Sequence, residues 1–463
     1  MGYLALLFCV AFTVWLLRKD VAIRGRLPRA LWIPLLWFLM YSSRPIARWL
    51  GAGGGATEEE GSPIDVIVQF CLIAGAFFVL NRRAFPWGKL VSLNPAFFVL
   101  FLYFALSILW TIYPFIAFKR LFKEFGNVMI ISVILTEADP AAAFKSICIR
   151  CATIWFPLSE VLIRWFPHYG RQYGNGGASM VTGVTTQKNS LGEICAFFGL
   201  VILWDMIDRY RNRTRGSPRG SFWPAAIVLA MGMALLLQSQ SKTSLLAFGI
   251  GVAIFLSVGI KLVARAPAFF AKCIFLAVAI GLVITAIWTV TIAPLLESIG
   301  RDPTFTERTR IWSTVLDQNI NPIIGCGFFS FWLEKGPSVW REFVNFQMNT
   351  AHSGYLEMYL DGGLIGCALL GAYLLYTSWR AANQFSTENT FARTLFAMIM
   401  MALIINFSET CFFRLGMTWC SLVLATLATY PLILRGNVIE EGAESYSPEP
   451  VSATVVESIY ESR

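Results

Sequence analysis

His352 is one of only two histidines in the chain, and two carboxylates follow it at a spacing that could support proton transfer. It closes a long polar stretch. Glu357 and Asp361 come next, within an apolar helix and one turn apart, so they lie on the same helical face. A carboxylate in or near a membrane is costly and by default indicates a functional site. The alternative is that His352 caps the helix and both acids face water; residue types alone leave both interpretations open.

An imidazole at the start of a helix suggests a particular kind of reaction. The N-terminal end of a helix attracts anions, and histidine is a common general base. His352 could take the proton from an attacking sugar hydroxyl while arginines neutralise a departing diphosphate. His168, in the segment HYGRQYG, is a weaker candidate that we expect to anchor a loop near the membrane surface.

The composition predicts an integral membrane protein. Of the 463 residues, 56% are hydrophobic and 14% are charged, and the mean hydropathy is +0.62. Soluble domains carry about 25% charged residues. Apolar runs long enough, or nearly so, to span a bilayer recur about thirteen times, so we expect an all-α polytopic membrane protein with about 12–13 transmembrane helices. The expected runs are 2–17, 29–43, 63–80, 93–113, 116–136, 144–163, 190–207, 222–239, 243–260, 273–292, 354–377, 392–409 and 416–434.

Arginine and lysine in short loops predict the orientation, because such loops remain in the cytoplasm. The basic loops are 18–29, 81–89, 209–219 and 261–272, and they occupy every second connection. This alternation places the N-terminus outside and the C-terminal tail in the cytoplasm. The expected organisation is transmembrane helices over 1–292 with a glycine-rich outer loop near 166–189, a large outer loop of short helices over 293–352, C-terminal transmembrane helices over 353–435, and an acidic, disordered tail over 436–463.

Some basic residues oppose this bias, so topology does not explain them. An anionic ligand at the outer surface would explain these residues, because arginine clamps phosphate with a planar fork and lysine binds it as a point charge. The alternative for each residue taken alone is pairing with a local acid or a lipid headgroup. The residues are Lys119, Arg120, Lys123, Arg171, Lys188, Lys242, Arg301, Arg308 and Arg310.

Other catalytic signatures are absent from the sequence. There is no GxSxG, Walker A or HExxH motif, and two histidines make a zinc site improbable. Cys148 and Cys151 lie within an apolar run, where packing explains them better than metal binding. We therefore expect no metal and no cofactor. The net charge of +9 reflects topology, so nucleic acid is not an expected partner.

Three motifs together resemble the O-antigen ligase and polymerase superfamily. The first is AHSGYLEMYLDGGLIG, which contains His352. The second is ERTRIWSTVLDQNINPIIGCGFFSFW, and the third is VTGVTTQKNSLGE. The N-terminal LWIPLLWFLMYSSRPIARWL is similar to the branch of exopolysaccharide polymerases, and the resemblance extends from about residue 30 to 434. The matching positions in the second and third motifs are Arg308, Trp312, Pro322, Gly325, Gly327, Gly183, Lys188, Asn189 and Gly192.

The resemblance implies a multi-pass enzyme of the bacterial inner membrane with a GT-C-like fold. Such enzymes transfer a glycan from undecaprenyl diphosphate to an acceptor hydroxyl, with inversion and without metal or nucleotide. The family roles carry over to Arg308, which would hold the diphosphate, and to His352. One position departs from the pattern: relatives often have Ser-Arg where this chain has Ser241 and Lys242, and lysine lacks the bidentate fork.

We therefore expect an exopolysaccharide polymerase that acts on an undecaprenyl-diphosphate-linked oligosaccharide and an acceptor glycan within the lipid bilayer, with other polysaccharide export proteins as partners. The alternatives are a ligase that moves the chain to lipid A core or a protein, and a flippase or other transporter. A transporter should show inverted repeats and polar residues at the midplane, and no clear repeat is visible. The expected catalytic residues are His352, Arg308 and Glu357, and the expected substrate-binding residues are Lys242, Lys188, Asn189, Arg310, Arg120 and Arg171.

Overall fold

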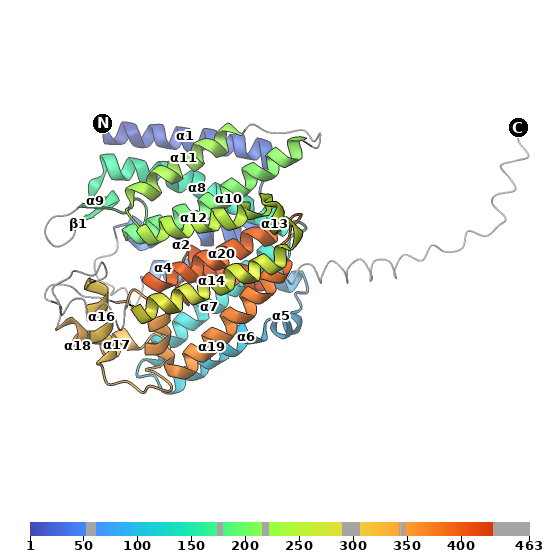
Figure 1. Ribbon diagram of the computed structural model, residues 1–463. Coiled ribbons are helices and arrows are strands. Elements are labelled where there is room, and N and C mark those ends of the chain that lie inside the picture. Colours follow the sequence, from blue (N-terminus) through green and yellow to red (C-terminus); the bar gives the residue numbers. More distant parts are fainter. Residues whose placement is uncertain are drawn as a thin grey trace, which may run out of the picture.

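The protein is an all-α polytopic membrane protein with one short β-hairpin. The computed structural model describes residues 1–51, 62–173, 179–214, 222–288, 306–341, 343 and 349–428. The long helices lie side by side in a bundle, with α16, α17 and α18 at one end and α5 and α13 at the other (Figure 1). Arg301 and the tail over 436–463 lie outside the described residues.

Each predicted apolar run contains a helix. The long helices are α1 (Gly2–Arg24), α2 (Trp32–Tyr41), α4 (Pro63–Arg82), α6 (Pro95–Leu106), α7 (Pro114–Leu135), α8 (Pro140–Trp165), α10 (Lys188–Thr214), α11 (Trp223–Gln238), α12 (Lys242–Leu256), α14 (Pro267–Ile287), α19 (Gly354–Gln384), α20 (Thr390–Ser408) and α21 (Met417–Leu427). The shorter elements are η1 (Arg29–Leu31), α3 (Ile46–Trp49), α5 (Trp87–Leu93), η2 (Ser107–Leu109), α9 (Pro167–Gly170), β1 (Arg171–Tyr173), β2 (Ser179–Val181), η3 (Ser257–Gly259), α13 (Lys261–Arg265), α16 (Thr306–Leu316), α17 (Phe331–Glu334) and α18 (Gly336–Trp340).

Not every predicted run is a complete span by its length and composition. Seven helices in the described part of the chain are long and apolar enough to cross a membrane, and α5 with α6 would make an eighth across a bend of 102°. Helices α2, α11 and α21 are apolar but shorter. Helix α7 carries Lys119, Arg120, Lys123 and Glu124 in its first half. The structure thus supports the predicted helices but fewer full spans than the 12–13 expected.

The described residues of the predicted basic loops lie at one end of the bundle, and several of them form ion pairs with acids. Arg24 lies 2.6 Å from Asp205, Arg209 lies 2.8 Å from the same carboxylate, and Arg83 lies 2.7 Å from Glu137. The chain's N-terminus lies at the other end, together with α16–α18 (Figure 1). The end that carries the basic loops is therefore separated from the end that carries α16–α18 by the length of the bundle (Figure 1).

Helix α19 is interrupted at Gly363, and the turn over 322–327 fills the break. Gly363 has φ 59° and ψ −159°, which is outside the helical region. The amide of Gly327 donates to the carbonyl of Asp361 at 2.8 Å, and the amide of Leu364 donates to the carbonyl of Pro322 at 2.9 Å. The turn thus replaces hydrogen bonds that the broken helix loses, which is the condition for irregular backbone within a membrane protein.

Glycine is required where this turn meets the helix. A Cβ on Gly325, which has φ +65°, would lie 2.5 Å from the carbonyl carbon of Asp361. A Cβ on Gly363 would lie 2.4 Å from the carbonyl carbon of Ile323. The Pro-x-x-Gly-x-Gly motif and the DGG segment of α19 are therefore two halves of one packing contact.

The described part of the large loop has a small core of its own. Helices α16 and α17 bury apolar side chains against each other and against the start of α19. The buried members are Ile311, Trp312, Val315, Cys326, Phe331, Trp332, Val339, Ala351 and Leu360. This core fixes α16 over the N-terminal end of α19, where the candidate site lies.

Candidate functional site

Three of the predicted site residues meet on one carboxylate, that of Glu409. Arg308 Nη2 lies 2.9 Å from Glu409 Oε1, and Asn189 Nδ2 donates to the same oxygen at 2.6 Å. His352 Nδ1 lies 3.7 Å from Glu409 Oε2. Glu409 is 6% exposed, so its charge depends on these partners. We call these four residues the Glu409 junction; they bring together α10, α16 and the ends of α19 and α20.

The backbone at the junction is held by a close approach of α19 and the α20–α21 loop. The amide of Gly354 donates to the carbonyl of Glu409 at 2.9 Å. A Cβ on Gly354 would lie 2.2 Å from Asn406 Oδ1, so only glycine fits there. Asn406 Oδ1 accepts from the amides of Cys411 and Phe412, both at 3.0 Å. These contacts fix Glu409 relative to the start of α19.

His352 stands directly before α19, as the sequence predicts. Its φ of 49° lies in the left-handed region, which costs a non-glycine residue about 1–3 kcal/mol. Its amide donates to Thr350 Oγ1 at 3.0 Å, and Ser353 caps the helix by accepting from the Leu356 amide at 3.5 Å. The strained backbone points to a residue held in place by its surroundings.

Helix α16 presents Arg308 and Trp312 on one face, because the two residues are one turn apart. Trp312 Nε1 donates to the carbonyl of Ala351 at 2.8 Å, and its ring meets Phe407 edge-on at 6.0 Å between centroids. Ala351 precedes His352 in the chain. The Trp312 bond therefore positions Arg308 and His352 together, which explains the spacing of the arginine and tryptophan in the motif.

Lys188 and Lys242 are the first residues of α10 and α12, and both helices start beside the junction. A Cβ on Gly192 would lie 2.7 Å from the Cβ of Ser241, so the turn before α12 packs tightly on α10. Thr243 Oγ1 lies 2.7 Å from Ser408 Oγ. Lys242 is exposed, and neither lysine has an ion pair within the described ranges. Two further positive charges therefore lie within a few residues of the groups that contact Glu409.

Glu357 and Asp361 hold the large loop in place. Glu357 Oε1 accepts from Trp332 Nε1 at 2.9 Å and from the Ala351 amide at 2.6 Å. Asp361 Oδ2 accepts from the Phe329 amide at 3.0 Å. Both acids are almost fully buried. The loop thus engages Oε1 of Glu357, and the predicted catalytic role of this residue stays a prediction.

Arg120 shares an aromatic partner, Phe329, with Arg414. Its guanidinium lies 4.4 Å from the ring centre of Phe329, and that of Arg414 lies 4.1 Å from the same centre. Arg414 Nη2 is also 3.7 Å from Glu357 Oε2. Such contacts between a cation and an aromatic face are favourable.

Two further predicted binding residues, Arg171 and Arg310, have contacts within the protein, and their binding role stays a prediction. Arg171 Nε donates to the carbonyl of Ile163 at 3.0 Å, and its Nη1 donates to Ser179 Oγ at 3.2 Å, within the antiparallel β1–β2 hairpin. The guanidinium of Arg310 lies over the ring of Phe343. His168 is exposed, and its role as a loop anchor stays a prediction.

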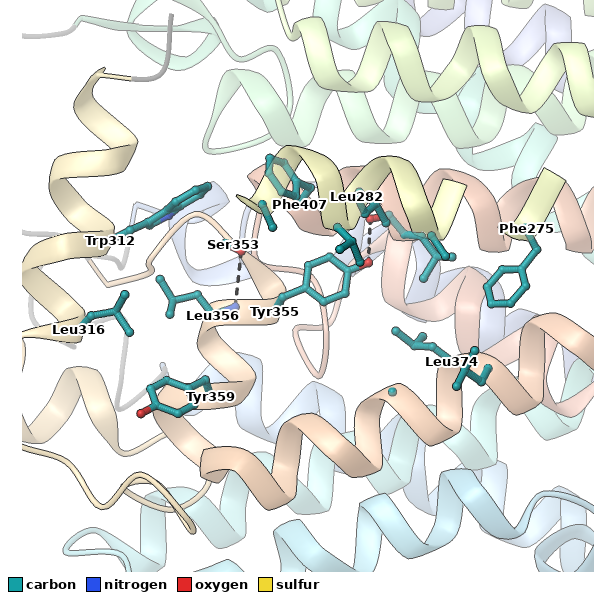
Figure 2. A pocket seen from close by; sticks show the side chains of 16 residues that line it. Phe275, Leu282, Trp312, Leu316, Ser353, Tyr355, Leu356, Tyr359, Leu374 and Phe407 are labelled. Carbon is teal, nitrogen blue, oxygen red and sulfur yellow. Dashed lines mark hydrogen bonds between the residues drawn. The ribbon is translucent and has the colours of Figure 1, made fainter. Parts of the chain in front are cut away.

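An apolar groove of about 650 Å³ runs from the junction along α14, α19 and α20. Trp312 and Ser353 lie at one end and Phe275 lies at the other (Figure 2). Only 6% of the apolar stretch of α14 is buried within the protein. The rest of this helix is available to the bilayer, so the groove is bordered by a lipid-facing helix. We call this space the apolar groove.

A polar cavity of about 380 Å³ lies between α2, α4, α7, α10 and the α20–α21 loop. Thr410 lines it and donates to the hydroxyl of Thr350 at 3.3 Å. Glu193 also lines it and accepts from Thr418 Oγ1 at 2.8 Å and from Cys411 Sγ at 3.7 Å. Burial raises the pKa of the Cys411 thiol well above its usual range, and Glu193 and Glu409 raise it further. Cys411 is therefore a thiol donor and not a nucleophile.

The sequence prediction missed Glu409, Arg414 and Arg44. Arg44 is buried, and its Nη2 donates to the carbonyls of Tyr169 and Gly183 at 2.6 and 2.7 Å, which organises the glycine-rich motif. Burial lowers the pKa of Arg44, and Arg48 lowers it further. Glu409 could have been found by the rule that an acid at the end of an apolar helix is costly.

The fold and the junction define a membrane protein with a charged site at one end of a helical bundle. Residues 225–371 match the family model described as O-antigen ligase, and this segment contains Arg308, Trp312 and His352. This segment of the chain is therefore similar to the O-antigen ligase family. No curated protein matches the chain.

Proposed function

We propose that the protein is an exopolysaccharide polymerase of the bacterial inner membrane. It would transfer an oligosaccharide from undecaprenyl diphosphate to a hydroxyl of an acceptor glycan at the periplasmic face. The observation that carries this proposal is the Glu409 junction, which places an arginine, an amide and an imidazole on one buried carboxylate. A ligase for lipid A core would use the same donor chemistry with another acceptor.

The donor diphosphate would lie between Arg308 and the starts of α10 and α12. Arg308 offers a planar fork for a phosphate, and Lys188 and Lys242 add point charges. Both lysines stand at helix N-terminal ends, where the helix dipole also favours an anion. The leaving group gains negative charge as the bond to the sugar breaks, and these cations would stabilise that charge.

The isoprenoid tail of the donor would occupy the apolar groove. From Phe275 to Ala286 the groove follows α14 for about 17 Å, at 1.5 Å per residue. Its lining is almost wholly apolar, and it ends beside Trp312 and Ser353, next to His352. A lipid entering from the bilayer would thus bring its diphosphate to Arg308.

His352 would act as general base. It takes the proton from the acceptor hydroxyl, and that oxygen attacks the anomeric carbon while the bond to the diphosphate oxygen breaks. Undecaprenyl diphosphate leaves, the new glycosidic bond forms, and attack from the opposite face inverts the configuration. Glu409 Oε2, at 3.7 Å from Nδ1, would orient the imidazole and stabilise it once it carries the proton. No metal is needed for these steps.

Deletion of the gene followed by analysis of lipid-linked and surface glycans tests this function. Loss of secreted polymer with single repeats retained supports a polymerase, and lipid A core lacking its chain indicates a ligase. Repeat units trapped on the cytoplasmic side indicate a transporter, but a transporter would place its polar site at the midplane and not at one end.

A further inference from the structure

The polar cavity lies beside the Glu409 junction, on a different side from the apolar groove. Thr410 and Cys411, which follow Glu409 in the chain, form part of its wall. The bond between Thr410 and Thr350 links that wall to the segment that carries His352. A molecule in the polar cavity would therefore lie against the wall that contacts the His352 segment, while the donor tail occupies separate space.

Two of the residues that line the cavity each carry a buried polar atom without a hydrogen-bond partner among the described residues. Gln69 is 8% exposed, and its Oε1 has no hydrogen-bond partner among the residues the structure describes. The hydroxyl of Tyr41 is likewise buried and unpartnered there. Buried polar groups in proteins are nearly always hydrogen-bonded. A bound molecule with several hydroxyl groups, such as a sugar, would satisfy both.

Two basic side chains, Lys123 and Arg414, line the cavity together with two acids, Asp65 and Glu193. Asp65 accepts from the Ile46 amide at 2.8 Å, and Glu193 accepts from Thr418. Lys123 is half-buried on the wall and forms no ion pair within the described part of the chain. Arg414 is the second cation of the same wall, and its Nη2 also lies 3.7 Å from Glu357 Oε2. An ammonium partly removed from water is stabilised by an anionic partner.

We propose that the polar cavity is the acceptor site and that the acceptor sugar bears a carboxylate. This inference rests on the proposed glycosyl transfer. The carboxylate binds Lys123 and Arg414, and ring hydroxyls bind Gln69 and Tyr41. One further hydroxyl then faces His352, which removes its proton.

Binding of two matched sugars to the purified full-length protein in lipid nanodiscs tests the proposal. Methyl β-D-glucuronide and methyl β-D-glucoside differ only in a carboxylate against a hydroxymethyl group, and calorimetry measures the affinity of each. We expect the glucuronide to bind at least about ten-fold more tightly, because a hydrogen bond to a charged group is worth about 1.5–3 kcal/mol. Equal affinity for the two sugars, or no binding of the glucuronide, overturns the proposal.

Variants of the lining residues separate the effect of the Lys123 charge on sugar binding from a general loss of structure. Lys123→Gln should reduce glucuronide affinity about ten-fold and leave glucoside affinity unchanged, whereas Lys123→Arg should retain it. Gln69→Leu should lower the affinity for both sugars, since it removes the side chain that hydrogen-bonds a ring hydroxyl. Lys261→Gln, an exposed position at the other end of the bundle, is the control and should change neither. An unchanged glucuronide affinity in Lys123→Gln contradicts the assignment.

His352→Ala distinguishes this proposal from the proposed function. The variant should still bind the glucuronide more tightly than the glucoside while its cells make no polymer. Loss of polymer without preferential glucuronide binding by the wild type rejects the acceptor site and leaves the glycosyl transfer in place. Polymer at wild-type yield rejects the transfer mechanism, and with it the description of this cavity as an acceptor site.

Discussion

Glu409 has three simultaneous contacts, and each partner comes from a different part of the chain. Arg308 and Asn189 share its Oε1, and His352 faces its Oε2. Sequence motifs predicted the three partners, but they did not predict the acid that brings them together. Partners on separate helices are set by tertiary packing, and a single sequence shows no pairing between residues so far apart in the chain.

Glu409→Gln should reduce polymer yield at least about ten-fold, because the charge that orients His352 and balances Arg308 is lost. Polymer is measured against the amount of protein in the membrane. The control is Glu137→Gln, which breaks the ion pair with Arg83 at the other end of the bundle. Equal yields from the two variants would show that the Glu409 charge has no part in the reaction.

Arg308→Lys tests the fork of the guanidinium. Lysine keeps the charge but not the two parallel donors, so we expect about a ten-fold loss of polymer at low donor supply and a smaller loss at high supply. Arg265→Lys, at an exposed position of α13, should have no effect. A wild-type response to donor supply in Arg308→Lys would contradict a bidentate contact with the diphosphate.

At the scale of elements, apolar runs predicted where the helices lie, because burial in lipid or protein demands a continuous apolar stretch. They did not predict the break in α19. Gly362 and Gly363 could have continued a helix, and the break follows from the turn over 322–327, which packs against it and takes its free hydrogen bonds. For the same reason the sequence shows the helical face of Glu357 but not the loop that covers it.

Gly325→Ala should lower the thermal unfolding temperature of the protein in detergent. The position has φ +65°, and the new Cβ would lie 2.5 Å from Asp361, so a cost of about 1–3 kcal/mol or more is expected. Gly249→Ala is the matched control: it lies in α12, and nothing is within 4 Å of the added Cβ. If both variants unfold at the wild-type temperature, the interlocked turn does not stabilise the fold.

At the scale of the whole molecule, two spaces of opposite character meet at one site. The apolar groove runs along α14 toward His352, and the polar cavity reaches the same region from α4 and α7. The sequence indicated a charged outer end and an apolar bundle, but not these spaces. Their walls come from helices distant in the chain, and their shape depends on packing that apolar periodicity does not encode.

Ala279→Trp should fill the apolar groove and reduce polymer yield about ten-fold, because the donor tail would lose its binding surface. Leu276→Trp adds the same bulk on α14 at an exposed position that does not line the groove. The comparison uses the membrane level of each variant as a reference. Equal polymer from both would indicate that the donor tail lies elsewhere.

The most direct test of the account is the polymer yield of cells whose only copy of the protein carries His352→Ala, measured together with its membrane level and the pool of lipid-linked repeats. The account predicts that polymer disappears, that the membrane level is unchanged, and that single repeats accumulate on the lipid carrier. Polymer at the wild-type yield, with the variant present at a normal level, would contradict the role of His352 as the base.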